Sequence, residues 1–345
     1  MQIRKATDQD EEEWNRYVLD HPDSLAYHQF AWKKAVTEAY RFKSCYLIAE
    51  EDEQICGVLP MIILKCPFCG CNYVSLPYCD VGGCLVDSAE IETLLIHKAK
   101  ELGIEDGISG IEYRTGQHRT SVEDVTDGDQ KVRMVLELPT SSEIYLSSLK
   151  SKLRSQIKKP LKDGLTAKLG GLELVSDFYQ IFSENMRDLG SPVHSLKWIK
   201  AIVRNYANSA QIGLVFTPDG ELAAGGIILM HRETVSIPWA SSLRRYNSQN
   251  ANVLLYWNFL SFAADHGYKI FDFGRSTIGE GTYRFKKQWG ATPRPLLWSD
   301  LLADKEELIP FKPSKLRMIS ERIWMKMPLF WCNSLGPLIR RYISL

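Results

Sequence analysis

The spacing of apolar residues changes along the first third of the chain. Residues 9–19 and 27–40 carry apolar side chains at helical spacing, and the apolar runs 45–49 and 55–64 follow them. Because an acidic segment separates these two runs, the pattern predicts two helices and then a β-hairpin. Beyond the hairpin, it predicts a strand at 72–78, a glycine-containing loop at 80–83, a helix at 88–102 and a strand at 107–114.

A similar order of elements recurs in the second half. There the pattern predicts helices at 174–190, 195–207 and 250–266, and strands at 210–217, 222–230, 233–240 and 269–273. Alternating helices and strands indicate α/β sheets, and the recurrence indicates an internal structural repeat without sequence identity. We therefore expect two related α/β domains, each with a mixed central sheet, that face each other across a cleft.

Chain length and composition agree with two folded domains. A chain of 345 residues exceeds what one hydrophobic core usually serves. Its 45% apolar and 24% charged residues are typical of a soluble globular protein, not of a disordered or fibrous one. We place the first domain at 1–143 and the second at 144–295, and we expect the segment 296–345 to pack back on the first domain.

The net charge of zero conceals two oppositely charged halves. Residues 1–143 carry 14 Lys and Arg against 26 Asp and Glu, a net charge of −12, and residues 144–345 carry 28 against 16, a net charge of +12. Since summed charge attracts ligands of the opposite sign, the second half is the one expected to bind anions such as phosphates, nucleic acid or lipid head groups.

A basic run occupies the start of the second half. Six cations fall within 13 residues that contain no acid: Lys150, Lys152, Arg154, Lys158, Lys159 and Lys162. Such a run can bind a tRNA backbone, a nucleoside diphosphate or anionic lipid. The alternative is a solvated helix face without a ligand.

The loop 241–250 lies between a predicted strand and a predicted helix, where an acetyltransferase fold has its pyrophosphate-binding turn. It contains no glycine, which weakens the case for coenzyme A, because backbone amides that bind pyrophosphate usually need glycine for close approach. Arg244, Arg245 and Tyr246 can instead bind a substrate through their side chains. A surface loop without function is the remaining interpretation.

Five of the eight cysteines cluster between residues 66 and 84, and Cys66 and Cys69 have the CxxC spacing of zinc ribbons. A second CxxC is missing, and the same segment is also typical of a hairpin turn. We therefore expect no metal, with Cys66 and Cys69 as the weak candidate ligands, and read the cysteines as free thiols of a cytosolic protein.

No apolar run approaches the roughly 18 residues that span a bilayer, and the acidic N-terminus does not have the order of a signal peptide. These features predict a cytoplasmic protein without a transmembrane segment. The tail 316–345 combines apolar and aromatic residues with Arg and Lys. It can either pack as a helix on the first domain or touch the inner face of the membrane as a peripheral contact.

The string Phe271-Asp-Phe-Gly-Arg-Ser276, followed by Gly279-Glu-Gly-Thr-Tyr-Arg-Phe-Lys-Lys-Gln-Trp-Gly-Ala291, resembles the signature of the Fem family of peptidoglycan-bridge aminoacyltransferases. It is similar in particular to the FemAB-like branch associated with exopolysaccharide loci. Three further segments fit the same family, Tyr27 to Lys33, Pro77 to Gly83 and Asn185 to Pro192. The resemblance covers about residues 25–295 and implies two tandem GNAT-like (acyl-CoA N-acyltransferase) domains.

The resemblance also implies roles for individual residues. The Phe-Lys pair of the family corresponds to Phe285 and Lys286, and the lysine is the residue that would stabilise the oxyanion formed when an amine attacks an ester or thioester. Asp272 would accept the amine proton or pair with Arg275. The remaining substrate-binding candidates are Lys33, Asp80, Gly82, Gly83, Arg187, Arg244, Tyr246, Arg275 and Tyr283.

Three functions follow as hypotheses. The first is N-acyl or aminoacyl transfer to an amine of a cell-envelope glycan or peptidoglycan-type precursor, with no permanently bound cofactor and with aminoacyl-tRNA as donor. The second is acyl-CoA-dependent N-acetyltransfer in polysaccharide biosynthesis. The chain lacks the long helical-hairpin insert that some family members use for tRNA, which puts the use of tRNA in doubt. The third is a non-enzymatic scaffold that binds anionic partners.

Overall fold

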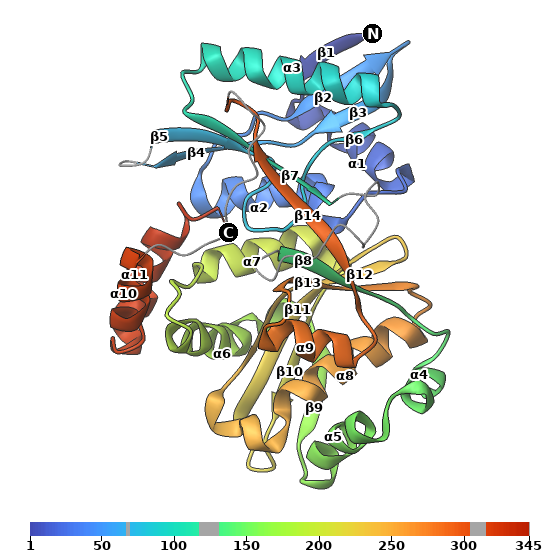
Figure 1. Cartoon of the computed structure of the whole chain (residues 1–345), viewed down its shortest axis with the longest axis vertical. Helices are drawn as coiled ribbons and strands as arrows, with labels where there is room; N and C mark the ends of the chain where they lie inside the picture. The colour runs from blue at the N-terminus through green and yellow to red at the C-terminus, as the bar shows by residue number, and fades with distance from the viewer. Residues whose placement is uncertain (67–69, 117–130, 304–314, 345) are drawn as a thin grey trace. The chain divides into compact units, whose positions relative to one another are not determined.

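The computed structural model describes residues 1–66, 70–116, 131–303 and 315–344 (Figure 1). The chain divides into two compact units. The first unit contains Met1–Lys131, Arg294–Phe311 and Tyr342–Leu345, and the second contains Val132–Pro293 and Lys312–Arg341. Each unit is a mixed α/β structure, as the pattern predicted.

The first unit carries one complete four-stranded sheet and four neighbouring strands of a second sheet. One has the order β1-β2-β3-β6, and strands β4, β5, β7 and β14 follow one another in the other. The elements are β1 (Gln2–Lys5), α1 (Glu11–Asp20), α2 (Phe30–Tyr40), β2 (Leu47–Glu51), β3 (Gln54–Leu59), β4 (Ile62–Cys66), β5 (Gly70–Val74), β6 (Leu85–Val86), α3 (Ala89–Glu105), β7 (Gly110–Gly116) and β14 (Thr292–Asp300).

The predicted single strand at 55–64 is wrong. Strand β3 ends at Leu59, strand β4 begins at Ile62, and the two belong to different sheets. Pro60 lies between them and has no backbone N–H to donate to a ladder, so the strand cannot continue through it. The run is apolar on both sides of the break because Leu59, before it, and Met61 and Ile62, after it, are all buried.

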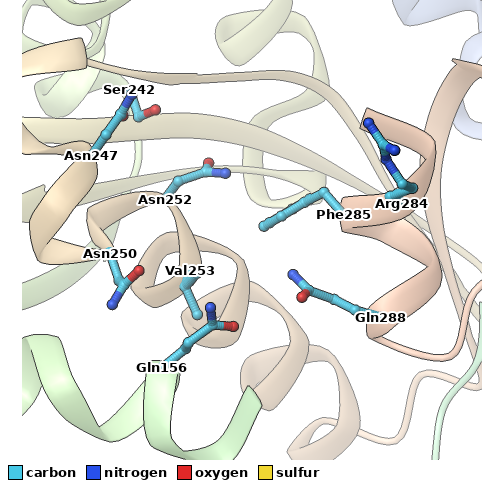
Figure 2. A pocket seen from close by; sticks show the side chains of 9 residues that line it. All are labelled: Gln156, Ser242, Asn247, Asn250, Asn252, Val253, Arg284, Phe285 and Gln288. Carbon is cyan, nitrogen blue, oxygen red and sulfur yellow. The ribbon is translucent and has the colours of Figure 1, made fainter. Parts of the chain in front are cut away.

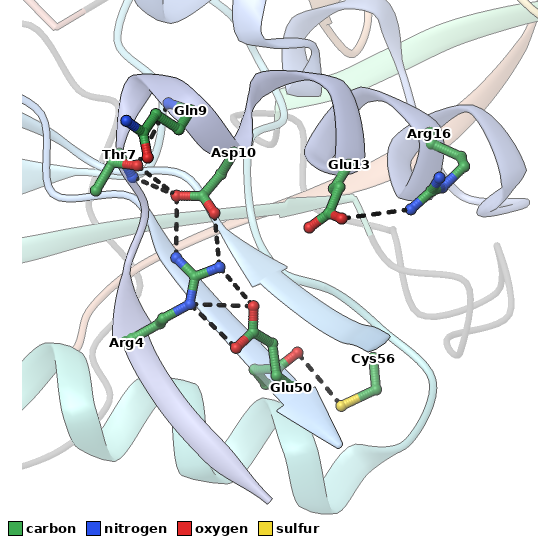
Figure 3. Close-up of polar contacts among 9 residues, drawn as sticks. Arg4, Thr7, Gln9, Asp10, Glu13, Arg16, Glu50 and Cys56 are labelled. Carbon is green, nitrogen blue, oxygen red and sulfur yellow. Dashed lines mark hydrogen bonds and ion pairs between the residues drawn. The ribbon is translucent and has the colours of Figure 1, made fainter. Parts of the chain in front are cut away.

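A charged network fixes the N-terminal strand of the first unit (Figure 3). The guanidinium of Arg4 on β1 donates to both carboxylate oxygens of Asp10, at 2.6 and 2.9 Å, and to the carboxylate of Glu50 on β2. The Arg4 hydrogen bond holds the pKa of the Asp10 carboxyl well below its usual range, and the backbone and side chain of Thr7 lower that pKa further. The network ties the first strand to the sheet and to the start of helix α1.

The second unit carries the strand order β8-β13-β12-β11-β10-β9. Its elements are β8 (Lys131–Glu137), α4 (Ser142–Ser148), α5 (Ser151–Lys162), β9 (Thr166–Gly170), α6 (Val175–Asp188), α7 (Leu196–Tyr206), β10 (Ala210–Phe216), β11 (Leu222–His231), β12 (Thr234–Ser242), the 3₁₀ helix η6 (Arg244–Gln249), α8 (Ala251–Asp265), β13 (Ile270–Thr277), α9 (Gly281–Gln288), α10 (Lys315–Trp324) and α11 (Leu329–Arg340).

Helices α6 and α8 cover opposite faces of this sheet. A Cβ atom at Gly225 of β11 would meet Phe178 of α6, and a Cβ at the next residue, Gly226, would meet Phe259 of α8. Successive residues of a strand point to opposite faces, so the two helices must lie on opposite sides. The glycines let both helices approach the strand closely.

The unit boundary differs from the prediction at both ends. Strand β8 lies before the predicted start at residue 144 and helix α4 begins before it, yet both belong to the second unit, which begins at Val132. The segment 296–345 was expected to pack on the first domain as a whole. In the structure Arg294–Phe311 belongs to the first unit, whereas helix α11 packs on α6 in the second.

Candidate active site

A polar cavity of about 530 Å³ opens in the second unit at the N-terminal end of helix α8 (Figure 2). Strand β12, the turn after it, helices α8 and α9 and one residue of α5 form its walls. The lining residues are Gln156, Ser242, Asn247, Asn250, Asn252, Val253, Arg284, Phe285 and Gln288. The cavity therefore lies at the loop 241–250 that the sequence predicted as a ligand-binding turn.

The strands beside the cavity separate before they reach it. Within the described strands β12 and β13, parallel pairing covers only Thr234–Ser236 with Ile270–Asp272. Strand β12 continues to Ser242 alongside β11, and β13 continues to Thr277. The outer half of β12 is therefore not paired with β13, which opens the sheet edge on the side where the chain turns into α8.

The start of helix α8 supplies hydrogen-bond donors. The first backbone N–H groups of a helix have no partner within it and carry a partial positive charge, which favours anions. Asn250, directly before the helix, has φ 58°, a left-handed conformation that asparagine tolerates better than most residues. The turn is thus made without the glycines whose absence weakened the coenzyme A interpretation of this loop.

The side chains in the cavity wall are suited to a polar or anionic ligand. Most of them are amides, which both donate and accept hydrogen bonds. Arg284 is the cation of the wall, and its side chain is exposed. The Oε1 atom of Gln156 is buried and has no hydrogen-bond partner among the described residues. A buried acceptor of this kind is normally satisfied, so a ligand N–H or O–H would fill a place that the protein leaves open.

The predicted Phe-Lys pair lies on helix α9 at the edge of this cavity. Phe285 lines the wall and packs edge-on against Tyr256, with ring centroids 5.0 Å apart. Lys286 is buried, and its Nζ donates to the backbone oxygens of Gly274 at 3.1 Å and Arg275 at 2.7 Å on β13. The ammonium is therefore held in place by two neutral carbonyl groups.

The other predicted residues of this region lie behind the wall. Asp272 is buried, accepts a hydrogen bond from the Gly274 N–H, and has its Oδ2 3.7 Å from Nε of Arg133 on β8. The sequence offered Arg275 as the partner of Asp272, and the structure adds Arg133, which no sequence pattern had indicated. The ring of Tyr283 lies 5.7 Å from the Nζ atom of Lys287 and does not line the cavity.

Arg187, Arg244 and Tyr246 gather at the end of helix α6, outside the cavity wall. Arg187 donates to the carboxylate of Asp188, and Arg244 donates to the backbone oxygen of the same Asp188 at 2.6 Å. The guanidinium of Arg245 lies over the Tyr246 ring and donates to Glu184. These contacts fix η6 on α6, which positions the turn that forms the cavity.

Lys33, the predicted acceptor-binding lysine of the first unit, is buried on helix α2. Its Nζ donates to Asp8 at 2.8 Å and lies 4.0 Å from the centre of the Phe30 ring. The Asp8 carboxylate is 89% exposed, so water solvates it on the other side. The bond to Lys33 lowers the pKa of Asp8 below its usual value.

The predicted loop with Asp80, Gly82 and Gly83 is tightly packed within the first unit. The backbone oxygen of Asp80 accepts a hydrogen bond from Nε1 of Trp298 at 3.0 Å. A Cβ atom on Gly82 would lie 2.5 Å from the backbone oxygen of Ser75, and one on Gly83 would lie 2.9 Å from a side chain of β7. The glycines of this loop are therefore explained by close packing against the first unit's own backbone.

The basic run forms helix α5 and the residue before it. Lys152, Lys158, Lys159 and Lys162 are exposed, and Arg154 donates to the backbone oxygen of Ser147. Lys150 is the N-cap residue. The opposite face of the helix buries Leu153 and Ile157, and α5 packs against α8. Because Gln156 of the same helix lines the cavity, the run lies beside the candidate site.

Among the described residues, the cysteine cluster shows no metal site. Cys69 lies outside the described residues, and Cys66 lies on β4 without a disulfide. Among the residues described, no group of three or more His, Cys, Asp or Glu could hold a metal ion. Burial raises the pKa of the Cys84 thiol to about 12, so this cysteine stays protonated and unreactive at neutral pH.

Several cavity residues were missed by the sequence analysis. Gln156 was hidden inside the basic run, and Asn252 carries no local motif. Asn250 and Gln288 lie within the loop 241–250 and the string 279–291, but neither was singled out there. For Arg284 there was one indication in the sequence. It directly precedes Phe285, so the two residues lie on the same helix, α9. No helix among the described residues is long and apolar enough to span a membrane.

In a comparison with known proteins, residues 147–287 match the family model described as "Acetyltransferase (GNAT) domain". No curated protein matches the chain. Among solved structures, the crystal structure of FemX matches with a TM-score of 0.67 at 14% identity, covering 86% of this chain and 95% of that one. L-PGS from Bacillus licheniformis matches with a TM-score of 0.54 at 12% identity, covering 92% and 98%.

A third structure is the tandem GNAT protein from the clavulanic acid biosynthesis pathway. It matches with a TM-score of 0.51 at 10% identity and covers 88% of this chain and 99% of that one. At such low identity these likenesses concern the fold. They confirm the predicted architecture of two tandem GNAT-like domains over most of the chain.

Proposed function

We propose that the chain is a Fem-like acyltransferase that transfers an acyl or aminoacyl group to an amine of a cell-envelope glycan or peptidoglycan-type precursor. The match of residues 147–287 to the acetyltransferase (GNAT) domain model supports the acyltransferase class. The observation that carries the proposal is the polar cavity at the start of α8, inside the matched domain. The resemblance to the Fem family and the fold likeness to FemX support the acceptor class.

The cavity is proposed to bind the phosphate-bearing part of the acyl donor. The N–H groups at the start of a 15-residue helix attract anions. Arg284 adds a full positive charge, and the amides of Asn250, Asn252 and Gln288 add further hydrogen bonds. The acyl group passes directly from the donor to the acceptor and is never attached to the protein. The proposed reaction therefore requires no permanently bound cofactor.

The reaction proposed is direct attack. The lone pair of the acceptor amine forms a C–N bond to the acyl carbonyl carbon, and the carbonyl oxygen becomes negatively charged. When the intermediate collapses, the bond to the thiolate or ribose oxygen of the donor breaks, and the amine proton leaves with that group or to water. We assign to Lys286 the stabilisation of this oxyanion by a fixed positive charge, worth about 3–4 kcal/mol in comparable sites. Phe285 shapes the wall beside it.

In this scheme Asp272 is a positioning residue. Its carboxylate is near Arg133 and accepts from the Gly274 N–H, and Gly274 in turn provides one of the two carbonyls that hold Lys286. We therefore propose that Asp272 fixes the β13 backbone that orients the ammonium. Removal of the carboxylate should loosen Lys286 without removing it.

Two donors compete for the cavity. Acyl coenzyme A is favoured by the family description and by the position of the cavity at the start of α8. Aminoacyl-tRNA is favoured by the exposed lysines of α5, which extend the positive surface along the helix that contributes Gln156. We place acyl coenzyme A first, since the cavity itself binds a compact phosphate group and tRNA would add contacts outside it.

The test is a donor screen with a matched pair of variants. Wild-type protein, Arg284→Gln and Lys287→Gln are incubated with acetyl coenzyme A or with mixed aminoacyl-tRNAs, together with an envelope extract, and products are identified by mass spectrometry. We expect the KM for the donor to rise roughly tenfold in Arg284→Gln, because hydrogen bonds to charged groups contribute about 1.5–3 kcal/mol. Lys287, exposed on the same helix, should change little.

Wild-type protein that consumes neither donor, although both remain intact, would rule out the proposal. An equal rise of KM in both variants would show that net charge alone acts at this helix, and the assignment of the cavity would then be wrong.

A further inference from the structure

Helices α10 and α11 expose an unusual number of large apolar side chains. Both belong to the second unit, and they appear in red beside α6 in Figure 1. Phe330 is 71% exposed and Leu338 61% exposed. Among the described side chains of the two helices and the turn between them, these residues are Met318, Ile319, Ile323, Met325, Phe330, Trp331, Leu335, Leu338 and Ile339, here called the apolar tail surface.

Helix α11 exposes its apolar face, whereas an ordinary surface helix buries that face. Its exposed apolar residues recur one turn apart at Phe330 and Trp331, then Leu335, then Leu338 and Ile339, which places them on one stripe. The face that packs inward carries the small residues Cys332 and Gly336. A Cβ at Gly336 would lie 3.0 Å from the backbone nitrogen of Val193, so this small face is the one fitted to the protein.

The charge of the same segment is strongly positive. Residues 315–341 contain six Lys and Arg and one acid, Glu321. Arg322 and Lys326 are exposed on α10 and in the turn, directly beside the apolar tail surface. Exposed Trp and Phe combined with Arg and Lys are typical of segments that lie in the interface of an anionic bilayer.

We propose that the apolar tail surface binds peripherally to an anionic lipid bilayer, with Phe330, Trp331 and Leu338 in the interface and Arg322 and Lys326 on lipid phosphates. The two helices have 10 and 12 residues, too few to span a bilayer, so they lie on it. A second copy of the chain is a poorer occupant, because it would bring two positive surfaces together.

This inference does not depend on the acyltransferase reaction, and its test measures binding alone. Full-length protein is mixed with vesicles of phosphatidylcholine or of phosphatidylcholine with one quarter phosphatidylglycerol, and the bound fraction is measured by co-sedimentation. We expect binding to the anionic vesicles only, and a loss of roughly tenfold in partitioning when Phe330→Ser and Trp331→Ser are combined. Leu338→Ser, on the same stripe, should weaken binding in the same direction.

Matched controls separate this surface from others. Ile104→Ser with Ile144→Ser removes two apolar residues that are 74% and 53% exposed elsewhere and should leave binding unchanged. Arg322→Gln with Lys326→Gln should weaken binding roughly tenfold. Lys158→Gln with Lys162→Gln, on the basic helix α5, should leave most of it intact.

Four results would overturn the inference. One is wild-type protein that stays in the supernatant with anionic vesicles. Another is unchanged binding after Phe330→Ser and Trp331→Ser, or a loss with the α5 pair that matches the loss with the tail pair. The last is a concentration-dependent dimer in sedimentation velocity that the Phe330→Ser and Trp331→Ser variant abolishes while wild type ignores lipid.

Discussion

Two buried lysines, one in each unit, have different surroundings. Lys33 in the first unit donates to the carboxylate of Asp8, whereas Lys286 in the second donates to the carbonyl oxygens of Gly274 and Arg275. A carboxylate carries a full negative charge that offsets the ammonium, while a carbonyl orients the ammonium through a dipole. The two lysines therefore form a matched pair for testing which unit carries the chemistry.

The turns near these lysines differ in the same way. The loop of the first unit is held on its own backbone by Arg114, which is fully buried and donates to the oxygens of Leu76 and Cys79. The turn of the second unit leaves a polar cavity and a buried acceptor on Gln156 without a partner among the described residues. A loop whose polar groups are already hydrogen-bonded within the protein has fewer donors and acceptors available for a ligand than a loop with an unsatisfied polar group.

The largest effect on stability is expected at Arg114. Its guanidinium also pairs with Glu112 at 2.6 Å and lies 4.1 Å from the Trp298 ring centre. Arg114→Ala should lower the free energy of unfolding by about 3–5 kcal/mol, because it leaves a carboxylate and two carbonyls without their buried partner. Urea unfolding of the variant beside Arg16→Ala, an exposed arginine of the same unit, measures the difference. Unchanged stability with lost transfer would make this loop a functional site.

A smaller effect is expected at Gly82. Gly82→Ala places a Cβ 2.5 Å from the backbone oxygen of Ser75, so the free energy of unfolding should fall by about 1–3 kcal/mol. Gly281→Ala in the second unit has open space around it and should be neutral or stabilising by up to about 1 kcal/mol. Melting temperatures of the two variants give the comparison. If both behave alike, close packing does not explain the glycines of the first unit.

The smallest effect concerns His194, which packs against Trp198 and, on β12, Trp239. Burial, aided by the charge of Arg340, lowers the pKa of His194 well below its usual 6.5. Below pH 6.5 the unfolded chain therefore binds a proton that the folded protein does not, and stability falls as the pH falls.

The limiting slope is about 1.4 kcal/mol per pH unit for one proton. Between pH 7.5 and 5, wild type should lose stability more steeply than His194→Gln in urea titrations. Parallel curves for the two proteins would show that His194 is protonated in the folded state.

Much of the fold follows from local pattern. The helices predicted at 174–190, 195–207 and 250–266 appear as α6, α7 and α8 within a few residues. Helices α6 and α7 each have a strong apolar face, and α8 is apolar on most sides. Strand β8 and helix α9 were not predicted. Strand β8 alternates buried and half-buried positions over only seven residues, and α9 is a short polar helix that buries little besides Lys286. Such elements are fixed by their tertiary neighbours.

The candidate site was predicted in position but not in composition. The order strand, loop, helix located the turn at 241–250, since that order depends on periodicity alone. The wall also needs Gln156 from α5 and Gln288 from α9, which meet the turn only after folding. The partner Arg133 of Asp272 was missed for the same reason, because the pairing of β8 with β13 leaves no sign in the sequence.

The most direct test compares the two lysines in one transfer assay. Lys286→Met and Lys33→Met are each measured for kcat with the active donor and acceptor, after circular dichroism shows that both are folded. We expect kcat to fall roughly 100-fold to 1,000-fold in Lys286→Met, as when an oxyanion-stabilising group is lost. Lys33→Met should remain within about threefold of wild type, because its partner Asp8 is already solvated. Normal turnover by Lys286→Met, or a larger loss in Lys33→Met, would contradict the assignment of the chemistry to the second unit.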